Sequence, residues 1–225
     1  MGLKVYYDLM SQPCRALIMF LKLNNIPFES KVIALRKGEH FMPEFTKLNP
    51  LQKVPVIDHD GFTLTESIAM IRYLSREFKV ADKWYPKDSK LQARVDEYLE
   101  WQHLNTRLFG SMIFRLRVIT PQLEQKPVDE KKLQFYKDNF VVALKNIENN
   151  FLKDKPYISG DTISVSDIFC ACEIEQPLVT GFNPLSEVPK VNDWLIRVRK
   201  ELEPYYSEVH QVPKLIESAI QKGKL

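Results

Sequence analysis

Residues 3–21 read LKVYYDLMSQPCRALIMFL and combine a strand pattern with a helix pattern. Leu3–Tyr7 is short, apolar and rich in residues that favour β-strands. Pro13 follows two polar residues, and proline is favoured in the first turn of a helix. Apolar residues then recur at the spacing of one buried helical face, at Cys14, Leu17, Ile18 and Leu21. This stretch therefore predicts a strand that leads directly into a buried helix.

The chain up to residue 78 continues with short strands and helices. The predicted elements are a strand at 28–35, a polar loop at 36–40, a short helix at 43–48, strands at 54–57 and 62–65 around a turn at 58–61, and a helix opened by Thr65, Glu66 and Ser67. The expected order is β-α-β-α-β-β-α. Its first β-α-β unit pairs two strands in parallel, and its last two strands form a hairpin.

Residues 88–225 are predicted to form an all-helical domain. A segment at 79–87 that contains Pro86 separates it from the domain of residues 1–78 and is interpreted as a linker. Apolar spacing predicts one long helix that begins near Leu91 and ends at Pro121, followed by a second that runs to Phe151. The expected fold class is thus an α/β domain followed by a helical bundle.

Two further patterns divide the last third of the chain. Ser164 is followed three residues later by Asp167, a spacing close to that of a capping box at the start of a helix. Pro204 and Pro213 are expected to separate short helices near the C-terminus.

Composition excludes several classes of function. The 225 residues carry 32 basic and 29 acidic side chains, and this net charge of +3 gives no indication of nucleic-acid binding. No apolar run approaches the about 20 residues that a membrane span needs, and the N-terminus lacks the pattern of a signal peptide. The three cysteines show no metal-ligand spacing and fit a reducing compartment. We therefore expect a cytoplasmic protein that binds no metal.

Ser11 lies between the first strand and the first helix, where unpaired backbone N–H groups and the helix dipole create a positive field. Its hydroxyl there either caps the helix or donates a hydrogen bond to an anion, and spacing alone favours the cap. Pro55 opens a strand, and it is either an ordinary trans residue at a sheet edge or a cis residue. A cis bond would turn the main chain of Val54 outward to pair with an extended peptide.

Glu66 and Ser67 open a helix, where the Ser67 hydroxyl and backbone N–H groups suit a carboxylate and Glu66 suits an ammonium group. The alternative is a first-turn glutamate beside a capping serine. His40 lies in a polar loop, and in isolation it fits a solvated surface histidine. The sequence contains no phosphate-binding glycine loop and no G-x-S-x-G turn.

Taken together, four motifs in order resemble the cytosolic glutathione transferases, specifically the theta class. They are residues 9–16 (LMSQPCRA), 49–55 (NPLQKVP), 64–69 (LTESIA), and 84–86 (WYP) with 93–99 (ARVDEYL). The resemblance covers most of residues 1–210. It implies a thioredoxin-like N-terminal domain, a helical C-terminal domain and a homodimer.

The resemblance also implies a detoxification reaction in which the thiolate of reduced glutathione, a co-substrate rather than a cofactor, attacks a small hydrophobic electrophile. Ser11 would then donate a hydrogen bond to the glutathione sulfur. The other implied contacts are His40 and Lys53 with the glycine end, Val54 with the cysteinyl main chain beside a cis Pro55, and Glu66 and Ser67 with the γ-glutamyl amine and carboxylate. Reduction of organic hydroperoxides is a further activity considered for the same thiolate.

The electrophile pocket implied by the resemblance lies between the domains. Its candidate residues are Gln12, Leu35, Arg107, Leu108 and Ser111. Arg107 would pair with an anionic leaving group or with the glycine carboxylate, and the alternative is a solvated helix arginine. Vertebrate theta-class proteins carry a longer C-terminus over this pocket, so a more open site is expected here.

Two alternatives to conjugation remain open at this point. The first is a non-catalytic binding or scaffold module with the same fold. The second is a glutaredoxin-like thiol reductase that uses Cys14, although the apolar stripe around Cys14 favours a buried thiol.

Overall fold

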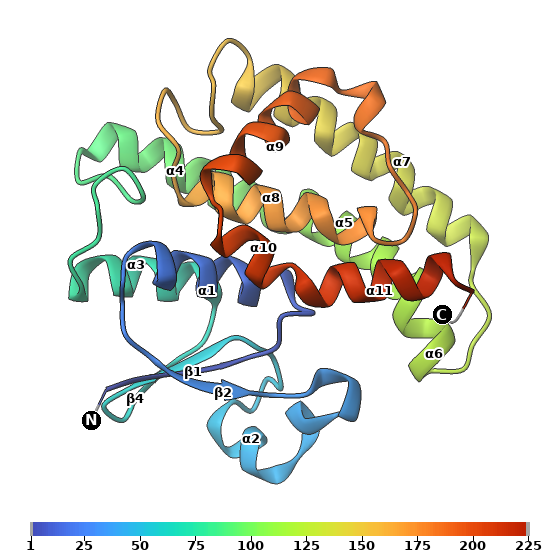
Figure 1. Ribbon diagram of the computed structural model, residues 1–225, viewed down its shortest axis with the longest axis horizontal. Helices are drawn as coiled ribbons and strands as arrows, with labels where there is room; N and C mark the ends of the chain where they lie inside the picture. Colours follow the sequence, from blue (N-terminus) through green and yellow to red (C-terminus); the bar gives the residue numbers. More distant parts are fainter. Residues whose placement is uncertain (1, 224–225) are drawn as a thin grey trace.

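A four-stranded sheet forms one layer of the molecule, and helices cover it (Figure 1). The computed structural model describes residues 2–223. The strands are β1 (Leu3–Tyr7), β2 (Glu29–Val32), β3 (Val56–His59) and β4 (Phe62–Leu64), in the order β2-β1-β3-β4. β1 and β2 are parallel, whereas β3 is antiparallel to both β1 and β4. The predicted β-α-β-α-β-β-α order is confirmed.

The hairpin between β3 and β4 is tighter than predicted. His59 pairs with Phe62, so only Asp60 and Gly61 form the turn, and both have positive φ. This is the conformation that two-residue hairpins favour, and Gly61 adopts it without steric cost. The Gly61 N–H donates to Asp58 Oδ1 at 2.9 Å.

Helix α1 (Gln12–Leu23) is buried between the sheet and the helical domain. Every residue from Gln12 to Leu21 is buried, and the helix packs against α8, α10 and α3. A helix that is buried on all sides can be apolar all round, and the buried residues of this one, Gln12 to Leu21, are apolar apart from Gln12 and Arg15. The other elements of this half are η1 (Leu35–Lys37), η2 (Glu39–Phe41), α2 (Pro43–Leu48) and α3 (Ser67–Glu77).

Residues from 89 onward contain helices and no strand within the part of the chain described. The helices are α4 (Ser89–Trp101), η3 (Gln102–Leu104), α5 (Thr106–Phe114), η4 (Arg115–Ile119), α6 (Thr120–Leu123), α7 (Glu130–Asn146), η5 (Ile147–Leu152), α8 (Val165–Leu178), η6 (Leu185–Glu187), α9 (Pro189–Glu201), α10 (Tyr205–Val209) and α11 (Gln211–Gln221). The segment 78–88 forms neither helix nor strand, and the domain limits of 1–78 and 88–225 stay a prediction.

α8 is the central helix of this domain, and its first ten residues are all buried. The predicted capping box is present at its start, where the Asp167 carboxylate accepts from the Ser164 N–H at 2.9 Å. Asp167 also accepts from the Trp194 indole N–H at 2.9 Å, which ties α8 to α9. Local capping and long-range packing therefore orient the same helix.

The prediction of one helix from Leu91 to Pro121 is wrong. The helix breaks at Asn105, whose side chain donates to the Trp101 carbonyl at 2.7 Å and so competes with helical backbone bonding. Pro121 does not end the second piece either, because it lies in the first turn of α6, directly after the π-helical turn of η4. Pro213 likewise lies in the first turn of α11 rather than between helices.

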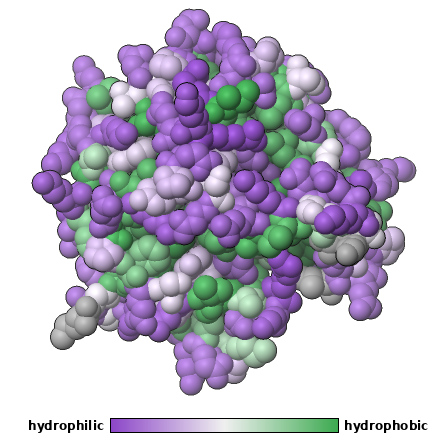
Figure 2. All heavy atoms as spheres, in the orientation of Figure 1, coloured by the Kyte–Doolittle hydropathy of each residue, from purple (hydrophilic) through white to green (hydrophobic). Residues whose placement is uncertain are grey.

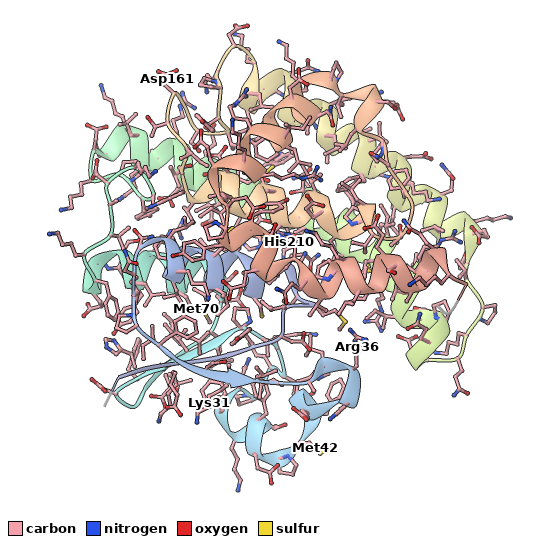
Figure 3. The ribbon with its side chains drawn as sticks, in the orientation of Figure 1. Lys31, Arg36, Met42, Met70, Asp161 and His210 are labelled. Atoms are coloured by element: carbon pink, nitrogen blue, oxygen red, sulfur yellow. The ribbon has the colours of Figure 1, made fainter. Side chains whose placement is uncertain are left out.

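The surface and interior follow this layering. Figure 2 shows a mostly hydrophilic face on which hydrophobic side chains appear along the junction of the two layers. In Figure 3, Met70 of α3 lies between the sheet and the helices, and His210 lies among the C-terminal helices; both are buried. No helix within residues 2–223 has the length and apolarity to cross a membrane.

Candidate functional site

Four chain segments converge at one edge of the sheet. The register pairs Tyr7 with Val32, Tyr6 with Val56, and Ile57 with Leu64. The ends of β1, β2 and β4 and the beginning of β3 consequently lie together. The segments that follow β1 and β4, and the segment that precedes β3, contain Ser11, Glu66 and Val54 respectively. Antiparallel pairing thus brings together residues that are far apart in the sequence.

A cleft of about 380 Å³ lies at this edge, between the sheet layer and α5. It is lined by eight predicted site residues, namely Ser11, Gln12, Leu35, His40, Lys53, Val54, Arg107 and Ser111. Four predicted residues lie outside its lining: Pro55, Glu66, Ser67 and Leu108. Pro55 is buried behind Val54, and Leu108 is rotated about 100° from Arg107 around the α5 axis.

Ser11 occupies the N-terminal boundary of α1. Its φ of −84° and ψ of 126° are extended, and its N–H donates to the Asp8 carbonyl at 3.0 Å. Its side chain makes no capping hydrogen bond, so the capping interpretation that spacing favoured is wrong. The hydroxyl therefore stands in the positive field of the helix N-terminus without being used to stabilise α1.

Asp8 organises the loop that carries Ser11. Its carboxylate accepts from the Met10 N–H at 2.8 Å and from the Leu35 N–H at 3.0 Å. Glu39 adds a similar bond from the Ala34 N–H at 2.7 Å. These bonds fix the segment after β2 against the segment after β1, so Leu35 and Ser11 line the same cleft.

The segment before β3 is held by Asn49, which is buried. The Asn49 amide donates to the Lys53 carbonyl at 2.8 Å and its oxygen accepts from the Leu51 N–H at 3.0 Å. The peptide bond between Val54 and Pro55 is cis, which decides between the two alternatives drawn from the sequence. Within residues 2–223, the main chain of Val54 takes part in no hydrogen bond outside the sheet.

The start of α3 differs from the alternative of a first-turn glutamate beside a capping serine. Glu66 is the boundary residue, is exposed, and has a left-handed backbone with φ of 64°. Ser67 is the first helical residue and is 4% exposed, so it does not act as the cap. Glu66 lies near enough to His103 to raise the pKa of the histidine, although burial and the charge of Arg107 lower the His103 pKa overall. The charge of Glu66 therefore acts on a residue of the helical half of the chain.

His40 and Lys53 form the polar end of the cleft. His40 is half-buried, and its pKa is lowered first by burial and then by the positive charge of Lys53. Its Nδ1 is buried and has no hydrogen-bond partner within the described part of the chain. Because His40 is kept neutral, Lys53 supplies the positive charge at this end.

Another part of the cleft lining is apolar. Met10, Phe114, Val118, Val179 and Ile216 form a buried cluster, against which Leu35, Ile119, Val212 and Ile220 pack. The cluster joins α11 to the segment that begins with Leu35, next to the Arg36 labelled in Figure 3. The cleft lining thus combines charged groups with the apolar side chains of Met10, Leu35, Phe114 and Ile119, as ligand sites commonly do.

Sequence reasoning missed several lining residues. They are Met10, Pro13, Gln52, Met112, Phe114, Arg115, Ile119 and Gln176. Arg115 and Ile119 follow Ser111 at successive steps of four residues, so helical periodicity contained a signal for them. Gln176 lies on α8, and no local pattern linked it to Ser11.

Cys14 is not accessible to a substrate. Its side chain is fully buried, and burial raises its pKa to about 12 despite a hydrogen bond with Ser11 that lowers it. Thiol–disulfide exchange requires an accessible thiolate, which such a group does not supply at neutral pH. Geometry therefore disfavours the thiol-reductase alternative.

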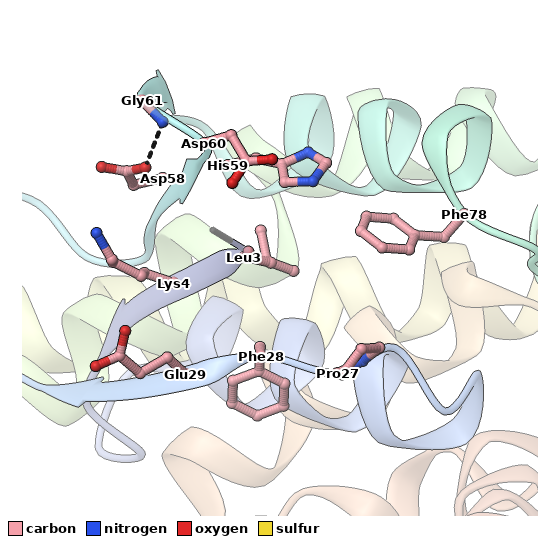
Figure 4. Close-up of a pocket in the computed structure, with 11 residues that line it drawn as sticks. Leu3, Lys4, Pro27, Phe28, Glu29, Asp58, His59, Asp60, Gly61 and Phe78 are labelled. Carbon is pink, nitrogen blue, oxygen red and sulfur yellow. Dashed lines mark hydrogen bonds between the residues drawn. The ribbon is translucent and has the colours of Figure 1, made fainter.

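A larger groove of about 840 Å³ lies at the opposite end of the sheet (Figure 4). Phe28, His59 and Phe78 line it together with the charged residues Lys4 and Glu29. No predicted site residue lines it, and no helix begins in its lining. Within residues 2–223, no group of three or more His, Cys, Asp or Glu side chains is placed to hold a metal ion. The smaller cleft is therefore the candidate active site.

Comparisons with known proteins agree on one family. The family model "Glutathione S-transferase, N-terminal domain" matches residues 11–77, and "Glutathione S-transferase, C-terminal domain" matches residues 111–201. Glutathione S-transferase theta-1 of Bos taurus is 41% identical over 213 residues, which cover 94% of this chain and 89% of that protein.

Two solved human structures are similar over nearly the whole chain. Glutathione transferase theta-2 in complex with glutathione is 33% identical, has a TM-score of 0.94, and is matched over 100% of this chain and 92% of that one. A theta-class glutathione transferase in complex with the glutathione conjugate of 1-menaphthyl sulfate is 34% identical, has a TM-score of 0.93, and is matched over 99% and 92%.

Proposed function

The chain belongs to the theta class of the glutathione S-transferase family, and on that premise we propose that Ser11 activates the thiol of glutathione for attack on small hydrophobic electrophiles. The chain is a glutathione transferase, and no finding favours the non-catalytic scaffold. The observation that carries the proposed mechanism is the Ser11 hydroxyl, which makes no capping bond at the start of α1 and lies in the wall of a cleft between the two layers.

Ser11 has to favour the thiolate over the thiol. A free thiol with a pKa of about 8.5 is only about 3% ionised at pH 7. A hydrogen bond to a charged acceptor contributes about 1.5–3 kcal/mol, which lowers the pKa of the acceptor by about one to two units. A decrease of one unit in the pKa of the thiol raises its ionised share to about 24% at pH 7. The thiolate then forms a bond to the electrophilic carbon, and the leaving group departs with its electron pair.

The remainder of glutathione extends along the sheet edge. The main chain of Val54 pairs with the cysteinyl residue, Glu66 accepts from the γ-glutamyl ammonium, and Ser67 donates to the adjacent carboxylate. Lys53 attracts the glycine carboxylate and neutral His40 donates to it. Opposite charges are thereby matched at both ends of the tripeptide, and the α3 N-terminus adds to the attraction for the carboxylate.

The electrophile lies against the apolar wall formed by Met10, Leu35, Phe114 and Ile119, with Gln12 and Ser111 nearby. Arg107 faces the same cleft and stabilises an anionic leaving group. The same thiolate also attacks one oxygen of an organic hydroperoxide, which breaks the O–O bond, releases an alcohol after uptake of a proton, and leaves the sulfenic acid of glutathione. A second glutathione then converts this sulfenic acid to glutathione disulfide and water. The reaction needs no bound metal or cofactor, so dialysis against a chelator should leave activity unchanged.

The protein works as a homodimer in the cytoplasm under this proposal. Family membership supports the dimer, and the exposed large side chains of Leu104 and Phe62, which are 74% and 50% exposed, are consistent with a covered surface. Sedimentation should give twice the chain mass of 26.4 kDa.

Replacement of Ser11 tests the mechanism. In Ser11→Ala we expect the pKa of bound glutathione, followed by the ultraviolet absorbance of its thiolate, to rise by about one to two units. Turnover at neutral pH should fall about 8- to 25-fold, in line with the lower ionised share of the thiol, while glutathione affinity changes little. Ser11→Thr keeps the hydroxyl and should retain most of the effect, and Cys14→Ala should keep the thiol pKa low. An unchanged thiol pKa in Ser11→Ala would contradict the proposal.

A further inference from the structure

Arg15 lies one helical turn after Ser11 and is fully buried. Its Nη1 donates to the carbonyl of Leu9 at 2.9 Å and to the carbonyl of Met10 at 3.1 Å. These two peptide groups immediately precede Ser11. One nitrogen of a buried side chain therefore holds the loop that carries the proposed thiol-activating hydroxyl.

The other terminal nitrogen of Arg15 reaches the helical domain. Nη2 donates to the Cys172 carbonyl at 3.2 Å and to Gln176 Oε1 at 2.7 Å. Cys172 and Gln176 are four residues apart, so they lie on the same face of α8, which packs directly against α1. The rigid guanidinium thus links the Ser11 loop to the central helix of the other layer.

The partners of Arg15 are unusual for a buried cation. Within residues 2–223, Arg15 forms no ion pair, and all four acceptors are neutral carbonyl or amide oxygens. Arg72 also joins the two layers, from α3 to α4, but it binds the carboxylates of Asp96 and Glu100. A buried cation that is held by neutral acceptors in place of a paired carboxylate is costly to keep, which points to a role beyond general stability.

Gln176 extends the link into the cleft. Because a guanidinium only donates, the amide oxygen of Gln176 must face Arg15, and its NH₂ group must point away. Gln176 lines the cleft together with Ser11. The Arg15 fork therefore orients a second polar group of the cleft wall as well as the Ser11 loop.

We propose that Arg15 is a positioning residue for catalysis, which clamps the Leu9–Met10 carbonyls to α8 and so holds the Ser11 hydroxyl against the glutathione sulfur. This inference rests on the role proposed for Ser11. The fork geometry matters as well as the charge, because one ammonium group cannot span the loop carbonyls and the two acceptors on α8.

The test measures the pKa of the thiol in the glutathione complex of each variant, with the unfolding midpoint and the glutathione dissociation constant alongside. Arg15→Lys keeps the charge and loses the forked guanidinium, and we expect the thiol pKa to rise by about one unit. At a pH below the wild-type thiol pKa, this rise corresponds to about tenfold less thiolate. Gln176→Met removes a single bond and keeps Arg15, so a smaller shift in the same direction is expected. It also keeps the proposal testable if Arg15→Lys does not fold.

Arg72→Lys is the matched control, since it also weakens a contact between the layers. It should lower the unfolding midpoint and leave the thiol pKa as in the wild type. If Arg15→Lys and Gln176→Met lose stability but keep the wild-type thiol pKa, while Ser11→Ala raises it, the clamp is refuted and the role of Ser11 stands. If Ser11→Ala itself leaves the thiol pKa unchanged, the proposed function fails first.

Discussion

Replacement of Glu66 by glycine is expected to stabilise the fold and weaken glutathione binding at once. Glu66 holds φ at 64°, a left-handed conformation that non-glycine residues adopt at a cost of about 1–3 kcal/mol. Its side chain is exposed and makes no capping bond that would offset this cost. Strain of this kind at a helix boundary beside a cleft is typical of a functional site.

The magnitude follows from two separate effects. Glycine adopts the left-handed region freely, so Glu66→Gly should gain about 1 kcal/mol, or about 2–4 °C in a chain of this size. Loss of the contact with the γ-glutamyl ammonium should remove about 1.5–3 kcal/mol of binding free energy, which weakens the glutathione dissociation constant about 10- to 150-fold.

Calorimetric titration with glutathione and thermal unfolding measure the two effects on the same samples. Glu66→Gln keeps the strained backbone and loses the charge, so it should weaken binding without raising the unfolding midpoint. Gln125→Gly is the matched control, because Gln125 has φ of 52° and lies outside the cleft. It should gain stability and bind glutathione normally. Wild-type affinity in Glu66→Gly would refute the ammonium contact, and a lower midpoint would refute the strain.

Three further predictions concern the rest of the chain. Asn49→Ala removes the amide that binds the Lys53 carbonyl, and urea denaturation should show a loss of about 1–3 kcal/mol together with weaker glutathione binding. All three thiols are buried, and burial raises the pKa of Cys14 and of Cys172 to about 12, so a disulfide reagent at neutral pH should label the protein only after unfolding. Burial, followed by the charge of Arg15, lowers the pKa of His210 well below its usual value. The free energy of unfolding should therefore fall as the pH drops below about 6.5, because the unfolded chain takes up a proton there that the folded chain does not. Urea denaturation of His210→Gln should show a weaker dependence on pH in this range.

The kinds and order of the elements were predictable because their signals are local. Helical spacing from Cys14 to Leu21 identified α1, and the pair Ser164 and Asp167 identified the start of α8 through a capping box. The family resemblance also rested on short motifs, such as residues 9–16. The break at Asn105 escaped prediction because a side chain there competes with the backbone for the Trp101 carbonyl.

The roles of the site residues depended on contacts that no local pattern records. Spacing favoured Ser11 as a helix cap, and only its geometry shows that the hydroxyl makes no capping bond. The segments that contain Glu66 and Val54 lie at the same edge of the sheet as the Ser11 segment because β3 pairs antiparallel with β1 and β4. Arg15 and Gln176 are 161 residues apart, and their hydrogen bond exists only because α1 packs on α8. The amino-acid order alone therefore determined most of the elements and the family, since periodicity and capping act over a few residues. The cleft and its polar network were decided by tertiary packing, since hydrogen bonds and charges act between whatever atoms the folded chain brings within a few ångströms.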